Sequence, residues 1–182
     1  RPAQRGDADG FEQLLLEHQK NVYNLCYRMA GNPDDAMDLS QETFLRAWRC
    51  LDQYQFASAF STWLYRLCSN ICIDFLRKRR RRQTVPLTFE DADGEEQTYA
   101  VPDAQPLPEE QVELKLTRET LAAAMAQLLP EHRAVLQLRV GDEMSYEQIA
   151  DVLDIQIGTV KSRLSRARNQ LKKILERGNL SR

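Results

Sequence analysis

The chain has 182 residues, 29% of them charged, a formal net charge of -2 and a pI of about 5.8. This length allows one or two domains. The near-zero net charge excludes a basic field over the whole surface. No apolar run reaches membrane length and no signal-peptide pattern opens the chain, so we expect a cytoplasmic protein without membrane insertion of its own. The chain begins at Arg1, which we interpret as a trimmed or engineered start.

The first third of the chain has the apolar periodicity of helices. Apolar residues between Phe11 and Met29 recur with a 3.6-residue period. The segment Gly31-Asn32-Pro33 ends that helix and starts a second, because Asn is a good N-cap and Pro suits the first helical position. We expect the second helix to run to about Trp48.

A third helix follows, capped by Ser58 or Ser61. It is expected to bury five apolar residues: Phe60, Leu64, Leu67, Ile71 and Phe75. The basic run Arg77 to Arg82 comes at its end. This run is either a solvated helix end or a phosphate-binding segment, and six consecutive cations favour phosphate contact.

The middle of the chain is acidic. From Gln83 to Leu114 there are nine acidic residues and no Lys or Arg, and four prolines, at 86, 102, 106 and 108, forbid long helices. We therefore predict an all-α protein with two small helical domains, at 1–82 and 110–182, joined by a flexible acidic linker at 83–109. We do not expect one undivided core.

The carboxyl-terminal part shows the signals of a helix-turn-helix. Helices are predicted at about 110–128 and from Pro130 to near Gly141. Ser145 then opens a short helix with Gln148 in the capping-box position. The turn follows at 154–156, where Asp154 can adopt the left-handed conformation.

The last helix has two chemically opposed faces. Its apolar stripe is expected to be buried and consists of Ile157, Val160, Leu164, Ala167, Leu171 and Leu175. The opposite face carries Thr159, Ser162, Arg163 and Arg166, flanked by Lys161 and Arg168. A helix of this kind can enter the DNA major groove. The alternative is an ordinary basic amphipathic helix in a bundle.

Two features of the amino-terminal part also bear on function. The segment 34–48 places acids and Gln41 on one helix with Phe44 and Trp48; it is a solvated helix start, a carboxylate metal cluster or a protein-docking face. The segment 60–66 interleaves aromatic residues with arginine, which suits single-stranded nucleic acid. The alternative for Trp63 is a core position.

The cysteines and the missing catalytic motifs limit the chemistry. Cys26, Cys50, Cys68 and Cys72 all lie in apolar helical patterns, so we expect buried thiols. Cys68 and Cys72 could share a helix face and bind metal or sense an oxidant, but their spacing matches no common zinc signature. There is no phosphate-binding glycine loop and no nucleophile paired with a base. We therefore expect no enzyme, no catalytic residue, no cofactor and no metal.

Three motifs together resemble a known family. They are DDAMDLSQETFLRAW, FSTWLYRLCSN followed by IDFLRKRRRR, and MSYEQIADVL with IGTVKSRLSRAR. In this order and spacing they resemble the extracytoplasmic-function sigma factors of bacterial RNA polymerase, from about Phe11 to Leu175. The resemblance implies a first domain that binds the polymerase clamp and melts the minus-10 element, and a second that reads the minus-35 element. The loop 54–59, which lacks the usual Gly or charged residue, and Ser165 depart from the family pattern.

The resemblance also assigns residues to three surfaces. The clamp-binding surface is Asp35, Asp38, Leu39, Gln41, Glu42 and Phe44. The minus-10 surface is Tyr54, Ser58, Trp63 and Asn70, extended by the cations Arg77, Lys78, Arg79 and Arg80. The minus-35 surface is Thr159, Lys161, Ser162, Arg163 and Arg166, with Thr159 expected on phosphate.

The implied partners are core RNA polymerase through its beta-prime clamp and beta subunits, promoter DNA and an anti-sigma factor, within a stress response. The remaining alternative is a free-standing helix-turn-helix transcriptional regulator. Such a regulator would normally carry a dimerisation helix or an effector pocket, and neither is visible in the sequence.

Overall fold

The computed structural model describes residues 8–54, 58–84 and 109–180, and within these ranges every regular element is a helix. The α-helices are α1 Ala8–Ala30, α2 Pro33–Arg49, α3 Phe60–Thr84, α4 Glu109–Ala126, α5 Pro130–Leu136, α6 Tyr146–Leu153 and α7 Ile157–Leu180. A short 3-10 turn, Leu51–Gln53, follows α2, and a π-helical segment, Gln137–Gly141, continues α5. The all-α prediction is confirmed.

The local sequence signals form the caps that they predict. Asn32 Oδ1 accepts a hydrogen bond from the backbone N–H of Asp35, and Pro33 is the first residue of α2. Ser145 and Gln148 make both hydrogen bonds of the capping box at the start of α6. Asp154 ends α6 in the left-handed conformation with a φ of 54°.

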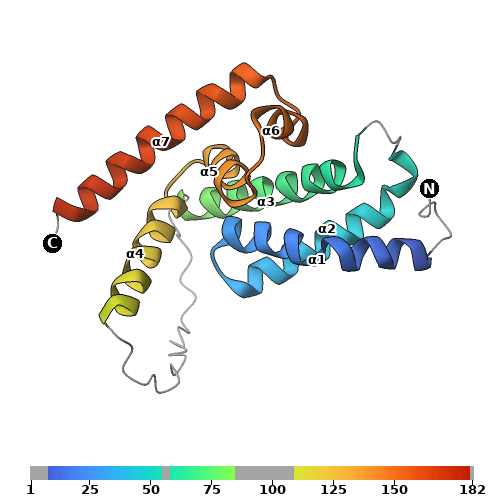
Figure 1. Cartoon of the computed structure of the whole chain (residues 1–182), viewed down its shortest axis with the longest axis horizontal. Coiled ribbons are helices and arrows are strands. Elements are labelled where there is room, and N and C mark those ends of the chain that lie inside the picture. The colour runs from blue at the N-terminus through green and yellow to red at the C-terminus, as the bar shows by residue number, and fades with distance from the viewer. Residues whose placement is uncertain (1–7, 55–57, 85–108, 181–182) are drawn as a thin grey trace.

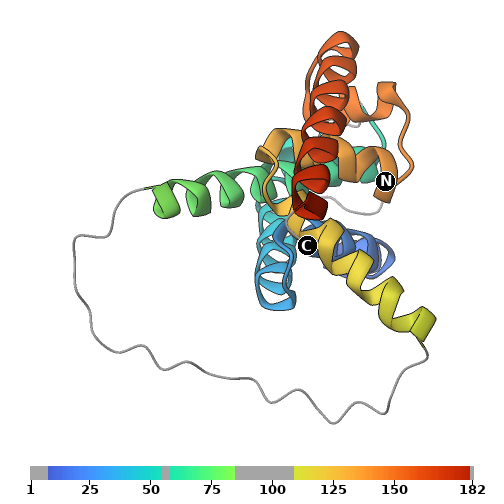
Figure 2. The same ribbon diagram turned by 90° about the vertical axis from the view of Figure 1, so that its left-hand side faces the viewer.

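Helices α1, α2 and α3 form an amino-terminal unit, residues 8–84 without 55–57, and α4 to α7 form a carboxyl-terminal unit, residues 109–180 (Figure 1). The first unit is built around fully buried side chains such as Leu25, Met29 and Leu64. Val160 and Leu164 of α7 are buried in the second unit. The basic end of α3 projects from the body of the molecule (Figure 2).

Two details of the predicted helices are wrong. Helix α3 begins at Phe60, after Ala59, so it starts between Ser58 and Ser61 and neither occupies the cap position. Ile157 was expected in the buried stripe but is 38% exposed. It is the first residue of α7, one turn before Val160, where the helix first packs against the core.

The two units pack directly against each other. Helix α3 contacts both α5 and α6, and α1 contacts the π-helical segment. The buried residues of both units form one continuous cluster, which differs from the expectation of a divided core. The reason is that α3 buries side chains on more than one side: Leu64 belongs to the amino-terminal core, whereas buried Tyr65 reaches Asp142 of the other unit.

The domain boundaries at 82 and 110 stay a prediction. Most of the predicted linker, residues 85–108, lies outside the described residues, whereas Gln83 and Thr84 end α3 and Glu109 begins α4. None of the described helices combines the length and apolar composition needed to cross a membrane.

Candidate protein and nucleic-acid interfaces

An apolar groove of about 500 Å³ lies between α1 and α2. It is lined by Phe11, Leu15, Gln19, Met37, Ser40, Gln41, Phe44, Leu45 and Trp48. Met37 and Leu45 are half exposed, at 50% and 52%, although both are apolar. The rings of Phe11 and Trp48 pack with their centroids 5.0 Å apart. Such a concentration of exposed apolar side chains is typical of a binding surface.

The predicted clamp-binding residues fall into two groups. Gln41 and Phe44 line the groove, and Asp38 and Glu42 are exposed on the same helix. Leu39, by contrast, is buried in the core. Asp35 accepts hydrogen bonds from Asn32 and, at 3.4 Å, from Arg79, so its carboxylate already has partners in the same unit.

Met37 and Leu45 line the groove but are not among the predicted clamp-binding residues. They stand four residues on either side of Gln41, so all three lie on one face of α2. This four-residue spacing could have revealed the groove from the sequence. It predicts an apolar stripe on α2 beside Asp38 and Glu42, on a side of the helix that the acids alone suggest is exposed to solvent.

An aromatic cluster occupies the start of α3. The ring centroid of Trp63 is 5.2 Å from that of Tyr54 and 5.5 Å from that of Phe60. The Tyr54 hydroxyl donates a hydrogen bond of 2.6 Å to the backbone carbonyl of Ser58. Trp63 is half-buried, so part of its indole remains free to contact another molecule. The structure thus brings together three of the residues assigned to the minus-10 surface.

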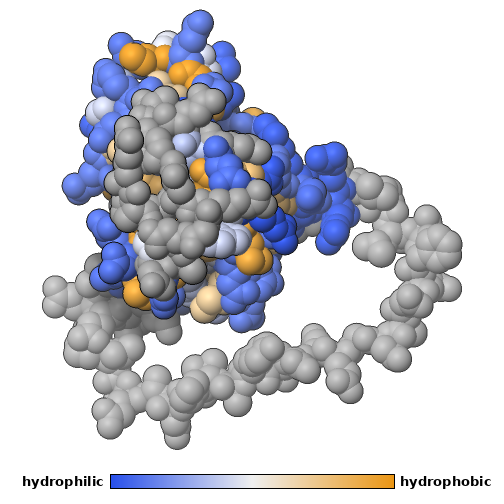
Figure 3. All heavy atoms as spheres, turned by 90° about the vertical axis from the view of Figure 1, so that its right-hand side faces the viewer, coloured by the Kyte–Doolittle hydropathy of each residue, from blue (hydrophilic) through white to orange (hydrophobic). Residues whose placement is uncertain are grey.

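Asn70 and the cations lie further along α3. Asn70 is exposed, seven residues and about two turns after Trp63, and so on the same side of the helix. Lys78 and Arg80 are exposed on the projecting end of α3 (Figure 3). Arg77 donates hydrogen bonds of 2.9 and 2.5 Å to Glu131 of α5. One predicted DNA-binding cation is therefore bound by the carboxyl-terminal unit.

The recognition face of α7 is largely open. Lys161, Ser162 and Arg166 are exposed, whereas Thr159 and Arg163 are half-buried. The Ser162 hydroxyl donates to the backbone carbonyl of Thr159 at 3.0 Å, so it can offer a ligand only its lone pairs. On the opposite face of the helix Val160, Leu164 and Ala167 are buried, whereas Leu171 and Leu175 are half-buried and Ile157 is exposed.

Glu131 connects the two predicted DNA surfaces. Burial works to raise the pKa of its carboxyl group, but a hydrogen bond from its own backbone amide and the nearby charges of Arg77 and Arg163 lower the pKa overall. The hydrogen bond that the Arg77 guanidinium donates to the Glu131 carboxylate raises the pKa of Arg77. The carboxylate thus bonds directly to one cation of the minus-10 surface, Arg77, and is influenced by the charge of one cation of the minus-35 surface, Arg163.

Further polar contacts hold the two units together. Arg28 forms a 2.5 Å ion pair with Asp142, whose other oxygen accepts a 3.2 Å hydrogen bond from the Tyr65 hydroxyl. Burial, and next the charge of Asp142, raise the pKa of Tyr65, so this hydroxyl stays a donor at neutral pH. Arg133 donates to the backbone carbonyl of Arg28 at 3.2 and 2.9 Å. Arg66 donates to the backbone carbonyl of Asp151 in α6.

Within the described ranges, one group of side chains has the arrangement of metal ligands: Cys26, Cys68 and Cys72, between α1 and α3. The acids of α2 do not form such a group there, which argues against the carboxylate-cluster alternative.

Comparison with known proteins identifies related sequences along most of the chain. The sigma-70 region 2 model matches residues 14–82, and a sigma-70 region 4 model matches residues 118–171. The chain is 34% identical over 171 residues to the ECF RNA polymerase sigma factor SigW of Bacillus subtilis, covering 94% of this chain and 91% of SigW. It is 36% identical to the RNA polymerase sigma-H factor of Pseudomonas aeruginosa, covering 95% and 90% of the two chains.

Two solved structures have a similar fold. CnrH, in complex with the cytosolic domain of CnrY, superimposes with a TM-score of 0.64 at 25% identity, covering 94% of this chain and 90% of CnrH. The sigma factor RpoE of Bartonella quintana, in complex with the anti-sigma factor NepR, gives a TM-score of 0.63 at 27% identity, covering 93% and 98%.

Proposed function

The chain belongs to the extracytoplasmic-function sigma factors of the sigma-70 family, and we propose that it directs core RNA polymerase to promoters through three separate surfaces. Each of the two matched family regions, 14–82 and 118–171, falls within one helical unit. The observation that carries this function is the combination of an apolar groove on the first unit with an open recognition helix on the second. The protein acts in the cytoplasm, by binding and DNA melting rather than by enzymatic catalysis.

The groove between α1 and α2 is the proposed docking site for the polymerase clamp. Its exposed apolar side chains can bury an apolar anchor of the partner, and Asp38 and Glu42 beside it can pair with basic groups at the rim. Apolar anchors in the centre supply most of the affinity of such interfaces, while rim charges set specificity and association rate. Leu39 would then support this surface from within the core.

Helix α7 is the proposed reader of the minus-35 element. Arg166 is exposed and Arg163 half-buried on one face, and arginine can contact guanine through two hydrogen bonds in the major groove. Lys161 and Thr159 stand nearer the start of the helix, where phosphate contacts position a recognition helix. The capping box and left-handed turn before α7 support its use in a helix-turn-helix.

The aromatic cluster at the start of α3 is the proposed site of minus-10 melting. An unstacked base can pack against the exposed part of Trp63, while the amide of Asn70 can hydrogen-bond to a base edge. Removing a base from the duplex stack costs a few kcal/mol, which such contacts must offset. The cations at 77–80 attract the phosphate backbone without reading sequence.

Promoter binding requires the two units to separate. The minus-10 and minus-35 elements lie about 25 base pairs apart, which is about 85 Å at 3.4 Å per base pair. In this structure, however, Arg77 of the minus-10 surface is hydrogen-bonded to Glu131 of the carboxyl-terminal unit. The 24 residues at 85–108 could span roughly 79–86 Å if fully extended, and the two units add their own extent, so the chain is long enough to permit the separation.

An anti-sigma factor is the proposed regulator. Of the two structural neighbours, RpoE is bound to an anti-sigma factor. The contacts of Arg28, Arg66 and Arg77 already bring the units together without a partner. We propose that an anti-sigma factor stabilises this closed arrangement and so keeps the DNA-binding faces apart from the promoter.

The test is run-off transcription with purified core polymerase and a library of genomic fragments. Specific transcripts that require both core and this protein are expected. A chain that binds promoter DNA tightly alone, and adds no new transcripts to core, would instead be a free-standing helix-turn-helix regulator.

A further inference from the structure

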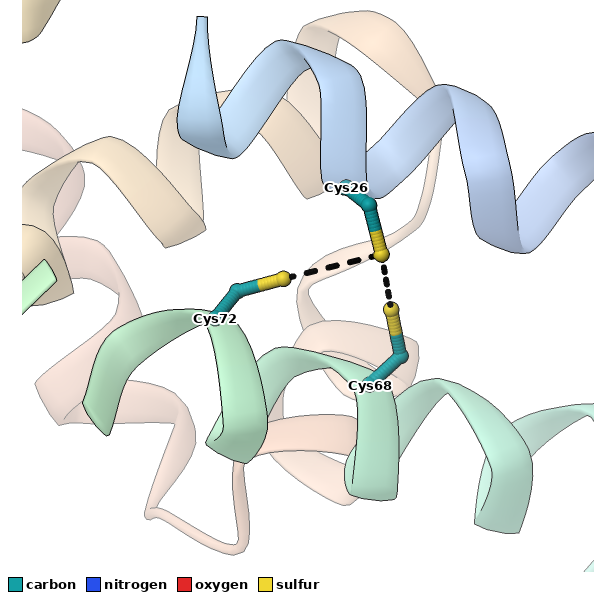
Figure 4. Close-up of side chains that lie close together, drawn as sticks. All are labelled: Cys26, Cys68 and Cys72. Carbon is teal, nitrogen blue, oxygen red and sulfur yellow. Dashed lines mark hydrogen bonds between the residues drawn. The ribbon is translucent and has the colours of Figure 1, made fainter. Parts of the chain in front are cut away.

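Three of the four cysteines meet between α1 and α3 (Figure 4). The sulfur of Cys26 lies 3.5 Å from that of Cys68 and 3.8 Å from that of Cys72. All three sulfurs lie within 4.8 Å of one another, and the three residues have no exposed surface. Cys50 is half-buried and stands outside this cluster.

Helix geometry explains how the cluster arises. Cys68 and Cys72 are four residues apart on α3, so their side chains leave the helix on the same face. Cys26 comes from α1 and points between them (Figure 4). The sequence spacing gives only the pair on α3, because the third sulfur is brought in by the packing of two helices.

The distances match those between the ligands of one metal ion. A metal bound about 2.3 Å from each of three thiolates separates the sulfurs by about 3.8 Å in tetrahedral geometry and about 4.0 Å in trigonal geometry. The two distances from Cys26, 3.5 and 3.8 Å, lie within a few tenths of an ångström of these values. The third separation, between Cys68 and Cys72, is at most 4.8 Å, so an adjustment of no more than about 1 Å would let the three sulfurs surround one ion.

One buried cation acts on the cluster. Hydrogen bonds among the thiols lower the pKa of Cys26, whereas hydrogen bonds and burial raise the pKa values of Cys68 and Cys72, so a bound metal must displace the protons of these two thiols. Arg133 of α5 is buried, and its charge acts on Cys72. No carboxylate of the described residues forms a salt bridge with Arg133, and a charge on Cys72 would raise the pKa of this guanidinium.

We propose that Cys26, Cys68 and Cys72 bind one soft, thiophilic metal ion as thiolates. Thiolate ligands select ions such as Cu(I) and Zn(II). Each thiol releases its proton to solvent as its sulfur–metal bond forms, and no electron transfer is needed. Three sulfurs suffice for Cu(I), whereas Zn(II) needs a fourth ligand, and no fourth ligand joins this fully buried cluster among the described residues. We therefore expect the tighter binding for Cu(I).

Arg133 couples this site to the packing of the two units. A metal with three thiolates has a net negative charge, which attracts the guanidinium of α5 toward α3. Metal occupancy therefore stabilises the closed arrangement, and the closed arrangement strengthens metal binding by the same factor. The effect on promoter binding rests on the proposed function, whereas metal binding itself does not.

The experiment uses the full chain, reduced and metal-free, without polymerase. It is titrated anaerobically with Cu(I) against a colorimetric Cu(I) chelator, and separately with Zn(II) against a zinc indicator. We expect one ion per chain and X-ray absorption showing three sulfur neighbours at about 2.2–2.3 Å. Cys26→Ala, Cys68→Ala and Cys72→Ala should each lose at least 100-fold in affinity, whereas Cys50→Ala should bind as the parent does.

Arg133→Gln should weaken binding on the order of tenfold without changing the sulfur count, since it removes only the compensating charge. Circular dichroism checks that each variant is folded. If a variant does not fold, the X-ray absorption spectrum of the parent protein still tests the three-sulfur site. Binding of neither ion, a spectrum without three sulfurs, or equal loss in Cys50→Ala would show that the cysteines only pack as small apolar side chains.

Discussion

Gly141 offers the sharpest test of the closed arrangement. It ends the π-helical segment beside Arg28, and a Cβ atom at this position would lie 2.6 Å from Arg28 Nε and 2.9 Å from its Cζ. These distances are too short for unbonded atoms, so Gly141→Ala must displace the Arg28 side chain. Arg28 cannot move freely, because it forms the ion pair with Asp142.

The free-energy cost of Gly141→Ala can be estimated from the contact between Arg28 and Asp142 that the added methyl group disturbs. Forcing one extra methyl group into a packed contact costs about 1–3 kcal/mol. Removing one partner of a fully buried ion pair costs about 3–5 kcal/mol, but Arg28 retains 26% of its side-chain exposure and can be rehydrated, so the lower range applies. A change of about 1–3 kcal/mol shifts the ratio of closed to open molecules about 5- to 150-fold.

Single-molecule Förster resonance energy transfer between dyes on exposed positions of α1 and α7 measures the ratio of closed to open molecules. The dyes are attached by non-cysteine chemistry, because the chain has four cysteines. We expect Gly141→Ala to populate a low-transfer state and to bind a promoter fragment that carries both elements more tightly by up to the same factor. Gly178→Ala is the matched control, since nothing lies within 4 Å of its added Cβ. Identical transfer distributions in the two variants would refute the reasoning.

Three further predictions concern the proposed surfaces. Reversing the charges of Asp38 and Glu42 together should abolish core-polymerase binding in a pull-down while circular dichroism stays unchanged; undiminished association would exclude this face. Arg166→Ala should cost about 1–3 kcal/mol in minus-35 binding and relax sequence preference across a library of variants, whereas Lys173→Ala should change affinity alone. If both respond alike, α7 does not read bases through Arg166. Trp63→Ala should leave closed-complex affinity nearly intact and slow strand opening, followed by 2-aminopurine fluorescence in the minus-10 element; a normal opening rate would assign the indole to the core.

Local signals account for the parts of the fold that the sequence predicts well. Asn32 and Ser145 cap helices through hydrogen bonds to residues three positions ahead, and Asp154 adopts its left-handed conformation within a single turn. Such interactions depend on neighbours in the sequence and can be recognised there. The exposed positions of Lys161 and Arg166 follow from helical periodicity in the same way.

The contacts between distant segments could not be predicted in this way. Cys26 is 42 residues from Cys68, and Arg28 is 114 residues from Asp142. Neither helical periodicity nor capping residues indicate such a pairing, because it depends on how whole helices pack against one another. The expectation of two separate cores failed for the same reason: the side of α3 that carries Tyr65 looks merely amphipathic until the carboxyl-terminal unit lies against it.

The two kinds of contact between the units should respond differently to DNA. The pair of Arg77 and Glu131 has side-chain exposures of 49% and 25%, and ion pairs this accessible contribute about 0–1 kcal/mol and weaken with salt. A DNA phosphate can therefore replace Glu131 as the partner of Arg77 with little loss of free energy. Asp142 is only 10% exposed and is held by Arg28 and Tyr65, so DNA has no direct access to it. Promoter DNA alone should thus break the Arg77–Glu131 pair without separating the two units. Full separation requires a partner whose binding free energy for the open chain exceeds the free energy that the Arg28–Asp142 contact contributes to the closed arrangement. Core polymerase, bound at the groove between α1 and α2, is the partner that the proposed function supplies.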